Sequence, residues 1–580
     1  MIEFSKKLQK KPLRVTQVLF LAFVIWFAAT FLIYPLWRVV IQTFFADGTF
    51  STAAIHKILK SQRALNSIKN SFLLAVCLTL TVNCVGTFLV LVTEYFEIKG
   101  AKILRLGYMS TLVFSGLIVS NGWLYLYGKE GVITKFLSTY IQNFNTDWFV
   151  GFPAVLLVMT FACTSNHMIF LANAVRSVDN NTIDAAKNLG ASQWKILKEI
   201  VLPTFKPVFL TLIVMTFAVG LGAFAAPIMV GGKSFQTIAP MILTFSGRPA
   251  SRDIATLLSI VLGISQMVLL FLITRNERKG NYLSIAKTKT RLVKQKITQP
   301  FARLAVNVCA WVLFAIYTLP IFFVVLFSFQ DTTAIAAQKW SLAHVTFEHY
   351  IRILSDVKSY GPLLRSFFYA GSAAALSVLF MLVFVRWLMK HQKQFFSQVL
   401  EYVYYIPWLV PTLMLALGYI LAYDRPSPLL FGQMVIGHQW ILPVAYLVIL
   451  LPNTLRYLKS AYYSFDKNLE DASRNLGASS FRTFWKVVLP ALMPVALALV
   501  ALNFNTNLAE YNMSTFLFQP GQETLGLIIR ANSDPMSTVD ARAINLVYSV
   551  ILMVMNTCIL YFVYGRGSKR HFEKSGVFSS

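Results

Sequence analysis

Four polar residues in an otherwise apolar segment have the types and the spacing to line a solute pathway. Asn503, Asn507, Glu510 and Ser514 follow one another at intervals that place them on one face of a helix. Polar and ionisable groups are costly inside a membrane, so they normally face a bundle interior or a water-filled path. We therefore predict that this face contacts a solute, with Glu510 near its outer end. The alternative is that Glu510 lies at the water interface and that the asparagines bond neighbouring helices.

The chain shows no comparable set of residues for covalent chemistry. Its nearest match to a phosphate-binding loop is Gly231-Gly232-Lys233-Ser234, but Pro227 stands where the motif needs its first glycine, so we interpret the segment as a turn. The five cysteines lie in apolar segments without CxxC spacing, which predicts neither a disulfide framework nor a metal site. We predict that the chain is not an enzyme and binds no cofactor or metal of its own.

A nine-residue segment occurs twice at an offset of 287 residues. The first copy, Asp-Ala-Ala-Lys-Asn-Leu-Gly-Ala-Ser, starts at Asp184, and the second, Asp-Ala-Ser-Arg-Asn-Leu-Gly-Ala-Ser, starts at Asp471. The same offset relates three further pairs, Asn166 with Asn453, Asp179 with Asp466, and Pro203 with Pro490. Because the chain has 580 residues, this offset indicates two related halves joined end to end.

Each copy is a polar interruption between long apolar segments, which predicts a loop that membrane helices present on one side. We expect Asp184 and Asp471 to start short helices, where a carboxylate favours the positive end of the helix dipole. Gly190 and Gly477 permit a turn that other residues make at a cost. Apolar residues at helical spacing then predict one exposed apolar face per loop, made by Trp194, Leu197 and Val201 in the first copy and by Phe481, Phe484 and Val488 in the second. A helix lying on the lipid surface is the alternative, although it does not explain the repetition.

The elements that hold these residues are membrane helices. The chain is 56% hydrophobic and 13% charged, with a mean hydropathy of +0.61, and a membrane span needs about 20 apolar residues. Twelve segments qualify, near 15–40, 71–95, 104–127, 149–173, 205–228, 254–274, 302–328, 366–389, 400–423, 440–461, 491–514 and 544–565. The predicted fold is an all-α polytopic membrane protein with about 12 transmembrane helices as two homologous six-helix halves. The halves are residues 1–274, with the loop 181–203, and 301–580, with the loop 468–490, joined by a basic linker at 275–300.

The net charge of +28 is explained by topology and not by nucleic acid. Basic residues gather in the N-terminal tail, the short loops, the linker and the C-terminal tail, which all fall on one side of a twelve-span chain. The positive-inside rule makes that side the cytoplasm, together with both termini and both repeated loops. The apolar run from Val15 to Tyr34 is too long for a signal peptide, so we expect it to remain as the first span.

The paired loops resemble the EAA loop of binding-protein-dependent ABC importer permeases, with Asp in place of the usual Glu and Ser473 in place of the second Ala. The resemblance covers essentially the whole chain, and it implies a fused, two-in-one permease of the type I (MetI-like) class in the bacterial cytoplasmic membrane. It also implies two partners, a homodimeric ABC ATPase that uses ATP and an extracytoplasmic solute-binding protein. The residues that the resemblance assigns to ATPase coupling are Asp184, Ala185, Ala186, Gly190, Trp194, Leu197 and Pro203, with Asp471, Ala472, Ser473, Gly477, Phe481, Phe484 and Pro490.

The substrate is suggested by a weaker resemblance. The fused length and the segment 520–526, Pro-Gly-Gln-Glu-Thr-Leu-Gly, look most like the ferric-iron group of this family. Other members of the family carry thiamine, polyamines, phosphonates or sugar phosphates. The carboxylate of Glu510 and the nearby amides are hard oxygen ligands that suit Fe³⁺, although they also suit an amine. An ion-coupled secondary transporter of six plus six helices is the alternative class, but it has no need of two loops in register.

Overall fold

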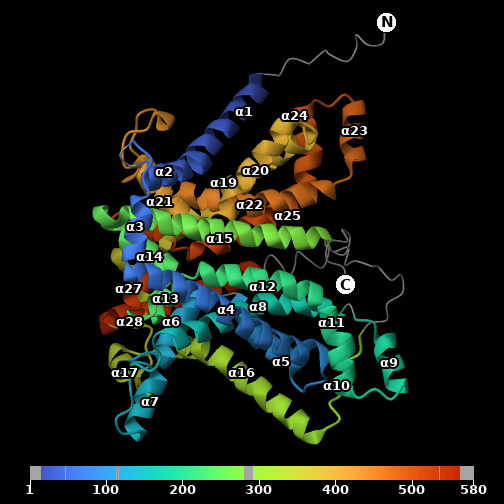
Figure 1. The fold of residues 1–580 in the computed structure, drawn as a ribbon, viewed down its shortest axis with the longest axis vertical. Helices are drawn as coiled ribbons and strands as arrows, with labels where there is room; N and C mark the ends of the chain where they lie inside the picture. The colour runs from blue at the N-terminus through green and yellow to red at the C-terminus, as the bar shows by residue number, and fades with distance from the viewer. Residues whose placement is uncertain are drawn as a thin grey trace.

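The computed structural model describes residues 15–45, 48–112, 114, 116–176, 178–279, 292–534 and 536–561, and the regular elements in these ranges are helices (Figure 1). The predicted all-α fold is therefore confirmed. The basic N- and C-terminal tails and residues 280–291 of the predicted linker lie outside the described residues.

The chain order is the same in both halves apart from short surface helices. The first half contains α1 Val15–Ala28, η2 Ala29–Ile33, α2 Tyr34–Phe44, α3 Ala53–Lys60, α4 Gln62–Val90, η3 Leu91–Tyr95, α5 Ala101–Met109, α6 Gly116–Tyr127, α7 Val132–Tyr140, α8 Phe152–Arg176, α9 Asn180–Asn188, α10 Gln193–Ile196, η5 Leu197–Val201, α11 Leu202–Thr204, α12 Lys206–Leu221, α13 Ala225–Val230, α14 Ile238–Ser246 and α15 Arg252–Lys279. The second half contains α16 Pro300–Phe327, α17 Thr332–Ala337, α18 Glu348–Ser355, α19 Val357–Lys390, α20 Phe395–Leu409, α21 Thr412–Tyr423, α22 Ile441–Tyr463, α23 Lys467–Asn475, α24 Ser480–Thr483, η9 Phe484–Val488, α25 Leu489–Leu508, α26 Ser514–Leu517, α27 Leu525–Asn532 and α28 Val539–Tyr561.

The third span of each half is interrupted. Within the described ranges, nine helices are long and apolar enough to cross a membrane, and two bent helix pairs raise this number to 11. The predicted span 104–127 is not one helix, because α5 ends at Met109 and α6 begins at Gly116. In the second half, α20 and α21 meet at an angle of 105° around Val410 and Pro411, where the proline lacks the N–H that would continue the helix. Among the described residues, the 11 candidates are five in the first half and six in the second, because α5 and α6 do not form one and the bent pair of the first half is Gln193–Thr204 with Val208–Leu221.

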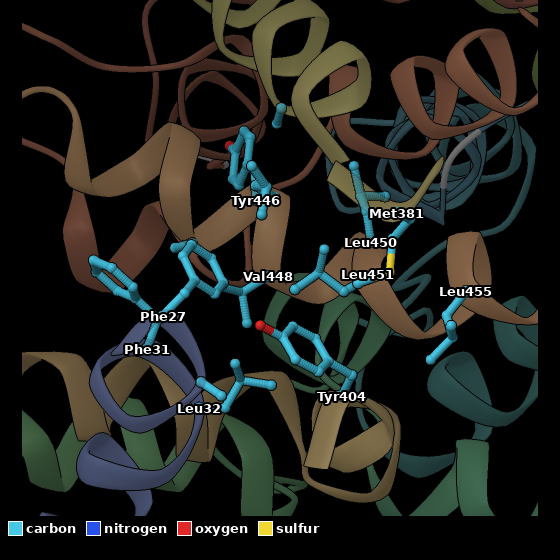
Figure 2. Close-up of a cluster of buried hydrophobic side chains, with 14 of the residues drawn as sticks. Phe27, Phe31, Leu32, Met381, Tyr404, Tyr446, Val448, Leu450, Leu451 and Leu455 are labelled. Carbon is cyan, nitrogen blue, oxygen red and sulfur yellow. The ribbon is translucent and has the colours of Figure 1, made fainter. Parts of the chain in front are cut away.

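The first span of each half packs into the core of the other half. Figure 2 shows Phe27, Phe31 and Leu32 from α1 and η2 in one buried cluster with side chains of α19, α20 and α22, and the hydroxyl of Tyr404 donates a hydrogen bond to the carbonyl of Val24 (2.9 Å). In the reciprocal contact, the Tyr108 hydroxyl of α5 donates to the carbonyl of Ala310 in α16 (2.7 Å). Each half therefore completes the other, and the two form one body.

The two repeated loops lie at the same end of this body. Figure 1 shows α9 and α10 of the first copy and α23 and α24 of the second on the right side of the view, with α6, α7, α17 and the label of α28 on the left; we call the right side the loop end. The prediction that both loops face the same side is therefore met by the helix arrangement.

Candidate functional site

Each repeated loop begins with a capped short helix. The carboxylate of Asp179 accepts a hydrogen bond from the N–H of Asn181 (3.1 Å) and caps α9, and Asp466 caps α23 in the same way. The prediction that Asp184 and Asp471 start these helices was wrong, because each is the fifth residue of its helix. The duplication of Asp179 as Asp466 is the sequence signal that identifies the true caps.

A left-handed glycine turn forms the tip of each loop. Gly190 and Gly477 have φ values of +82° and +81°, the conformation that glycine adopts most easily and that the sequence predicted. The leucine before each glycine is the most exposed apolar side chain of its loop, with Leu189 88% exposed and Leu476 89% exposed. These leucines were not among the predicted coupling residues, although both belong to the repeated segment.

The apolar turn after each glycine does not form one exposed face. Trp194 and Phe481 are 69% and 73% exposed, whereas Leu197 and Val201 are buried in the first half. The turn becomes a π-helix in both copies, as η5 and η9, and the spacing rule for an α-helical face no longer applies there. Of the predicted coupling residues, Asp184, Ala185, Gly190, Trp194, Asp471, Ala472, Gly477, Phe481 and Pro490 are exposed, Ala186, Pro203, Ser473 and Phe484 are half-buried, and Leu197 is buried.

The two loops have internal contacts of opposite character at equivalent positions. These positions are occupied by Ile183, Ala186 and Ile196 in the first loop and by Glu470, Ser473 and Thr483 in the second. The first set belongs to an apolar cluster in which both isoleucines are buried. In the second set, the hydroxyls of Ser473 and Thr483 are hydrogen-bonded (3.1 Å). The departure of Ser473 from the repeated sequence is therefore matched by a second polar residue.

Glu470 is the centre of an ion cluster that holds the second loop. Its side chain is only 10% exposed, and its carboxylate lies 2.9 Å from Arg474 Nη2, 3.4 Å from Lys390 Nζ and 3.5 Å from Arg386 Nη2. The Tyr462 hydroxyl donates to it at 3.2 Å. Burial by itself raises the pKa of Glu470, but the charges of Lys390, Arg386 and Arg474 outweigh it and hold this pKa below the ordinary value for a glutamate.

Arg386 connects this cluster to the transmembrane helix α19. Its Nη2 also donates to the Ser480 carbonyl (2.8 Å), and its guanidinium lies 4.5 Å from the centre of the Phe484 ring. A planar guanidinium can make both kinds of contact at once. The second loop is thus anchored through an arginine of α19.

The first loop is anchored through residues 292–298, which we call the strap. Gln295 donates its N–H to the carbonyl of Tyr95 (2.8 Å) and accepts from the N–H of Glu97 (3.0 Å), and Lys294 Nζ donates to the Thr93 carbonyl (2.6 Å). The strap belongs to the predicted linker 275–300, so the described end of this linker is attached to the first half.

The strap also bonds the short helices of the first loop. The Val293 N–H donates to Asn180 Oδ1 of α9 (3.2 Å), and Gln193 Oε1 of α10 accepts from the N–H of Thr298 (3.1 Å). Gln193 Nε2 donates to the carbonyl of Lys296. The two loops are therefore held by different chemistry, an amide-bonded strap for the first and an ion cluster for the second.

The predicted pathway residues do not share one helix. α25 ends at Leu508, so Glu510 and Ser514 lie beyond it and the predicted single face was wrong. The Glu510 carboxylate accepts hydrogen bonds from the N–H groups of Met513 (2.9 Å) and Ser514 (3.4 Å). Glu510 therefore stabilises the turn that leads into α26.

The two asparagines of this set bond neighbouring helices, which was the alternative interpretation. Asn503 Nδ2 donates to Thr454 Oγ1 of α22 (2.8 Å) and to Ser377 Oγ of α19 (3.2 Å). Asn507 Nδ2 donates to the carbonyl of Tyr446 (3.3 Å). Both side chains are buried.

A cavity of about 370 Å³ lies between the halves, and Asn503 lines it. The first half contributes Gly222, Phe224, Leu262 and Gln266. The polar side chains in the lining are those of Gln266, Thr412, Asn453, Asn503, Thr506 and Asn512. Among the described residues, this lining is neutral, and its oxygen donors are amides and hydroxyls.

Two equivalent aromatic residues meet beside this cavity. Phe224 lines the cavity and stacks on Tyr511 of the other half, with ring centres 5.2 Å apart and planes inclined by 18°. Tyr511 follows Phe224 by 287 residues, the offset of the duplication. Equivalent residues can touch only near the axis that relates the two halves, so this pair marks that axis. Both rings are buried.

Comparison with known families agrees with this duplicated architecture. Residues 103–278 and residues 387–566 each match the family described as the binding-protein-dependent transport system inner membrane component. The chain belongs to this family. It is a fused permease subunit of an ABC importer, and it works with a binding protein and an ATPase in the inner membrane.

The relatives of this permease are themselves permeases. The probable ABC transporter permease protein y4fN of Sinorhizobium fredii is 33% identical, over 94% of this chain and 96% of its own length. The ferric transport system permease protein FbpB of Actinobacillus pleuropneumoniae is 23% identical, over 93% of this chain and 77% of its own length. A crystal structure of a bacterial ABC transporter involved in alginate import matches 45% of this permease and 94% of the solved chain, at 20% identity and a TM-score of 0.39.

Proposed function

We propose that this permease carries ferric iron, which a separate extracytoplasmic binding protein delivers to it, and that a homodimeric ATPase drives the transport. The single observation that supports the mechanism best is the pair of repeated loops at one end of two interlocked halves (Figure 1). The proposal of iron is supported by the similarity to a ferric transport permease along nearly the whole chain.

In the proposed mechanism, each loop transmits ATPase motion to its own half. The exposed tips formed by Leu189 and Leu476, with Trp194 and Phe481 beside them, contact one ATPase subunit each. The strap attaches the first loop to η3, which continues α4, and the Glu470 cluster attaches the second loop to α19, so a movement of the tips reaches the membrane helices. We propose that the end carrying the loops is cytoplasmic, as are both termini, which agrees with the basic residues gathered there.

The seam cavity is the proposed solute path, and of the four predicted pathway residues we retain Asn503 in it. Amide and hydroxyl oxygens suit a hard cation such as Fe³⁺. A lining without carboxylates binds such a cation weakly, which is favourable for passage because the solute must also leave. The stacked pair of Phe224 and Tyr511 is the proposed constriction, and separation of the two halves would open it.

Uptake of radiolabelled ferric iron tests this proposal in cells with and without the permease. Deletion should abolish uptake, and the wild type should restore it. The double variant Gly190→Asp and Gly477→Asp should not restore it at equal membrane abundance, because a side chain is strained at both positive φ values. Competition by unlabelled thiamine, polyamine, phosphonate and sugar phosphate identifies the substrate if it is one of those. Unchanged iron uptake in cells without a second iron system would end the iron assignment.

A further inference from the structure

A second cavity lies between the halves at the end opposite the repeated loops. It has a volume of about 60 Å³ and is lined by the end of α6 and the residues after it from the first half, and by Gln338 just after α17, the end of α27 and residues of α28 from the second half (Figure 1). About four water molecules or one small polyatomic ion would fill this volume. None of the chemistry proposed above uses this cavity.

A hydrogen-bond network builds one wall of the cavity and joins the halves. Asn121 Oδ1 of α6 accepts from Ser533 Oγ (3.0 Å) and from Asn545 Nδ2 of α28 (3.2 Å), and Asn121 Nδ2 donates to Ser549 Oγ (3.2 Å). These side chains are fixed by one another, so the wall is preorganised.

Four polar atoms around the cavity have no hydrogen-bond partner among the described residues. They are the hydroxyl of Tyr125, Oε1 of Gln338, Nε of Arg542 and Oδ1 of Asn545. The side chains of Tyr125, Gln338 and Asn545 are buried. An unpaired buried polar group costs about 1–3 kcal/mol. The hydroxyl of Tyr125 and Nε of Arg542 therefore need an acceptor in the cavity, and the two amide oxygens need a donor such as water.

Two of these atoms define the chemistry of that partner. Nε of Arg542 can only donate, and the hydroxyl of Tyr125 is free to donate. Arg542 forms no ion pair with a carboxylate of the described residues. The Tyr125 ring is held in place by Phe327, with ring centres 5.2 Å apart. A fixed hydroxyl and an unneutralised guanidinium on one small cavity are suited to an anion that accepts from both.

The other charged residues at the cavity do not remove its preference for an anion. Lys129 is paired with Asp147 and Glu130 with Lys135, each at 3.3 Å. Asp534 is exposed at the rim, and its carboxylate accepts from the N–H of Met536 (2.9 Å). Arg542 and Asp534 are therefore the lining charges without an ion pair among the described residues, and of these two only Arg542 can donate to an anion.

We propose that this cavity binds a small carboxylate or oxyanion, held by Arg542 and Tyr125, which links α6 of the first half to α28 of the second. Because the anion contacts both halves, its binding stabilises their closed arrangement at this end by mass action. This site is independent of the identity of the transported solute.

The test is anion-dependent thermal unfolding of the full-length permease in nanodiscs, with sodium acetate or sodium bicarbonate compared with sodium chloride at equal ionic strength. The wild type should show a saturable rise in Tm with one of these anions. Tyr125→Phe, which keeps the ring contact, and Arg542→Lys should each weaken the apparent affinity about tenfold or more, the effect of losing a hydrogen bond to a charged group.

Tyr350→Phe and Arg352→Lys are the matched controls at the same end of the molecule, because Tyr350 bonds Ser328 and Arg352 pairs with Asp540 outside the cavity. Both should respond as the wild type does. If Arg542→Lys does not fold, Tyr125→Phe decides the question alone. A wild type without any specific anion response would show that the cavity holds only water, and an unchanged response in Tyr125→Phe would equally overturn the proposal.

Discussion

The ion cluster at Glu470 predicts that the second coupling loop can be loosened by one charge change without effect on the first. Glu470→Gln keeps the shape of the side chain but removes the one acid of the described residues that pairs with Arg386, Lys390 and Arg474. Removing one member of a buried ion pair costs about 3–5 kcal/mol. The side chains of Lys390 and Arg474 are a third or more exposed and remain solvated, whereas Arg386 stays buried.

We therefore expect Glu470→Gln to lower the local stability of the second loop by about 2–3 kcal/mol, less than the full cost of breaking a buried pair. This corresponds to about 30- to 150-fold more frequent local opening of α23 and α24. The assay is hydrogen exchange of the permease in nanodiscs, comparing peptides that cover 466–484 with peptides that cover 179–197. Exchange should accelerate in the second loop alone, because the first loop is held by apolar contacts and by the strap.

The duplication supplies the matched control. Ile183→Val, at the position equivalent to Glu470, should destabilise α9 by about 1 kcal/mol. Hydrogen exchange should therefore accelerate in α9 and stay unchanged in α23. The double variant Glu470→Ile and Arg386→Leu should restore slow exchange in α23, because an apolar replacement of a buried pair is often neutral. Equal acceleration in both loops after Glu470→Gln, or none in the second, would refute the assignment of this cluster as the anchor.

The pH dependence of the second loop follows from the same residue. Because the pKa of Glu470 is lower in the folded protein than in the unfolded chain, its contribution to stability is complete above the unfolded value of about 4.3. This contribution is lost as the pH falls through the folded value. At neutral pH the cluster is fully formed, and acidification should loosen α23 before α9.

Three further predictions concern other parts of the chain. Tyr511→Ala removes half of the stacked pair at the seam and should make proteoliposomes leaky to small solutes, measured by release of an entrapped dye, whereas tight vesicles would contradict its role as a constriction. Gln193→Ala should free the strap and increase proteolysis within 292–298, and Ser480→Ala at the equivalent position should not. Asp331→Ala removes the cap of α17 and should cost about 1 kcal/mol in thermal unfolding. The Asp331 carboxylate accepts a hydrogen bond from the Ala334 N–H and is also bonded by His344 and Thr333. These bonds lower the pKa of Asp331 to about 2, so the cap should persist down to that pH.

Much of the architecture could be predicted from the sequence because it depends on composition and repetition. Long apolar segments gave the helices, and the 287-residue offset gave two halves with a loop in each. The interruption of the third span in the first half was not predicted, because hydropathy averages over a window. In the second half Pro411 is the sequence signal of a kink, since proline removes a backbone donor, although the full break between α20 and α21 was not predicted. The packing of each first span into the core of the other half was also not predicted, because packing partners far apart in the chain leave no periodic signal in the sequence.

The candidate site was predicted in part. The glycine turns at Gly190 and Gly477 followed from residue type. The helix caps were assigned five residues too late, because Asp184 and Asp471 lie inside the nine-residue repeat, whereas the true caps Asp179 and Asp466 precede it. The pathway prediction assumed that α25 continues to Ser514, whereas it ends at Leu508. The offset of 287 between Phe224 and Tyr511 was present in the sequence, but only the structure shows that the two rings touch.

The central claim is that both repeated loops transmit the work of a separate ATPase, and ATPase retention tests it most directly. The complex would be purified through a tag on the permease, as wild type, Leu189→Lys, Leu476→Lys and the double variant, and the bound ATPase quantified at equal permease amounts. A charge at either exposed tip should reduce the bound ATPase, and the double variant should lose it while the permease remains folded. Wild-type amounts of ATPase on the double variant would contradict the account.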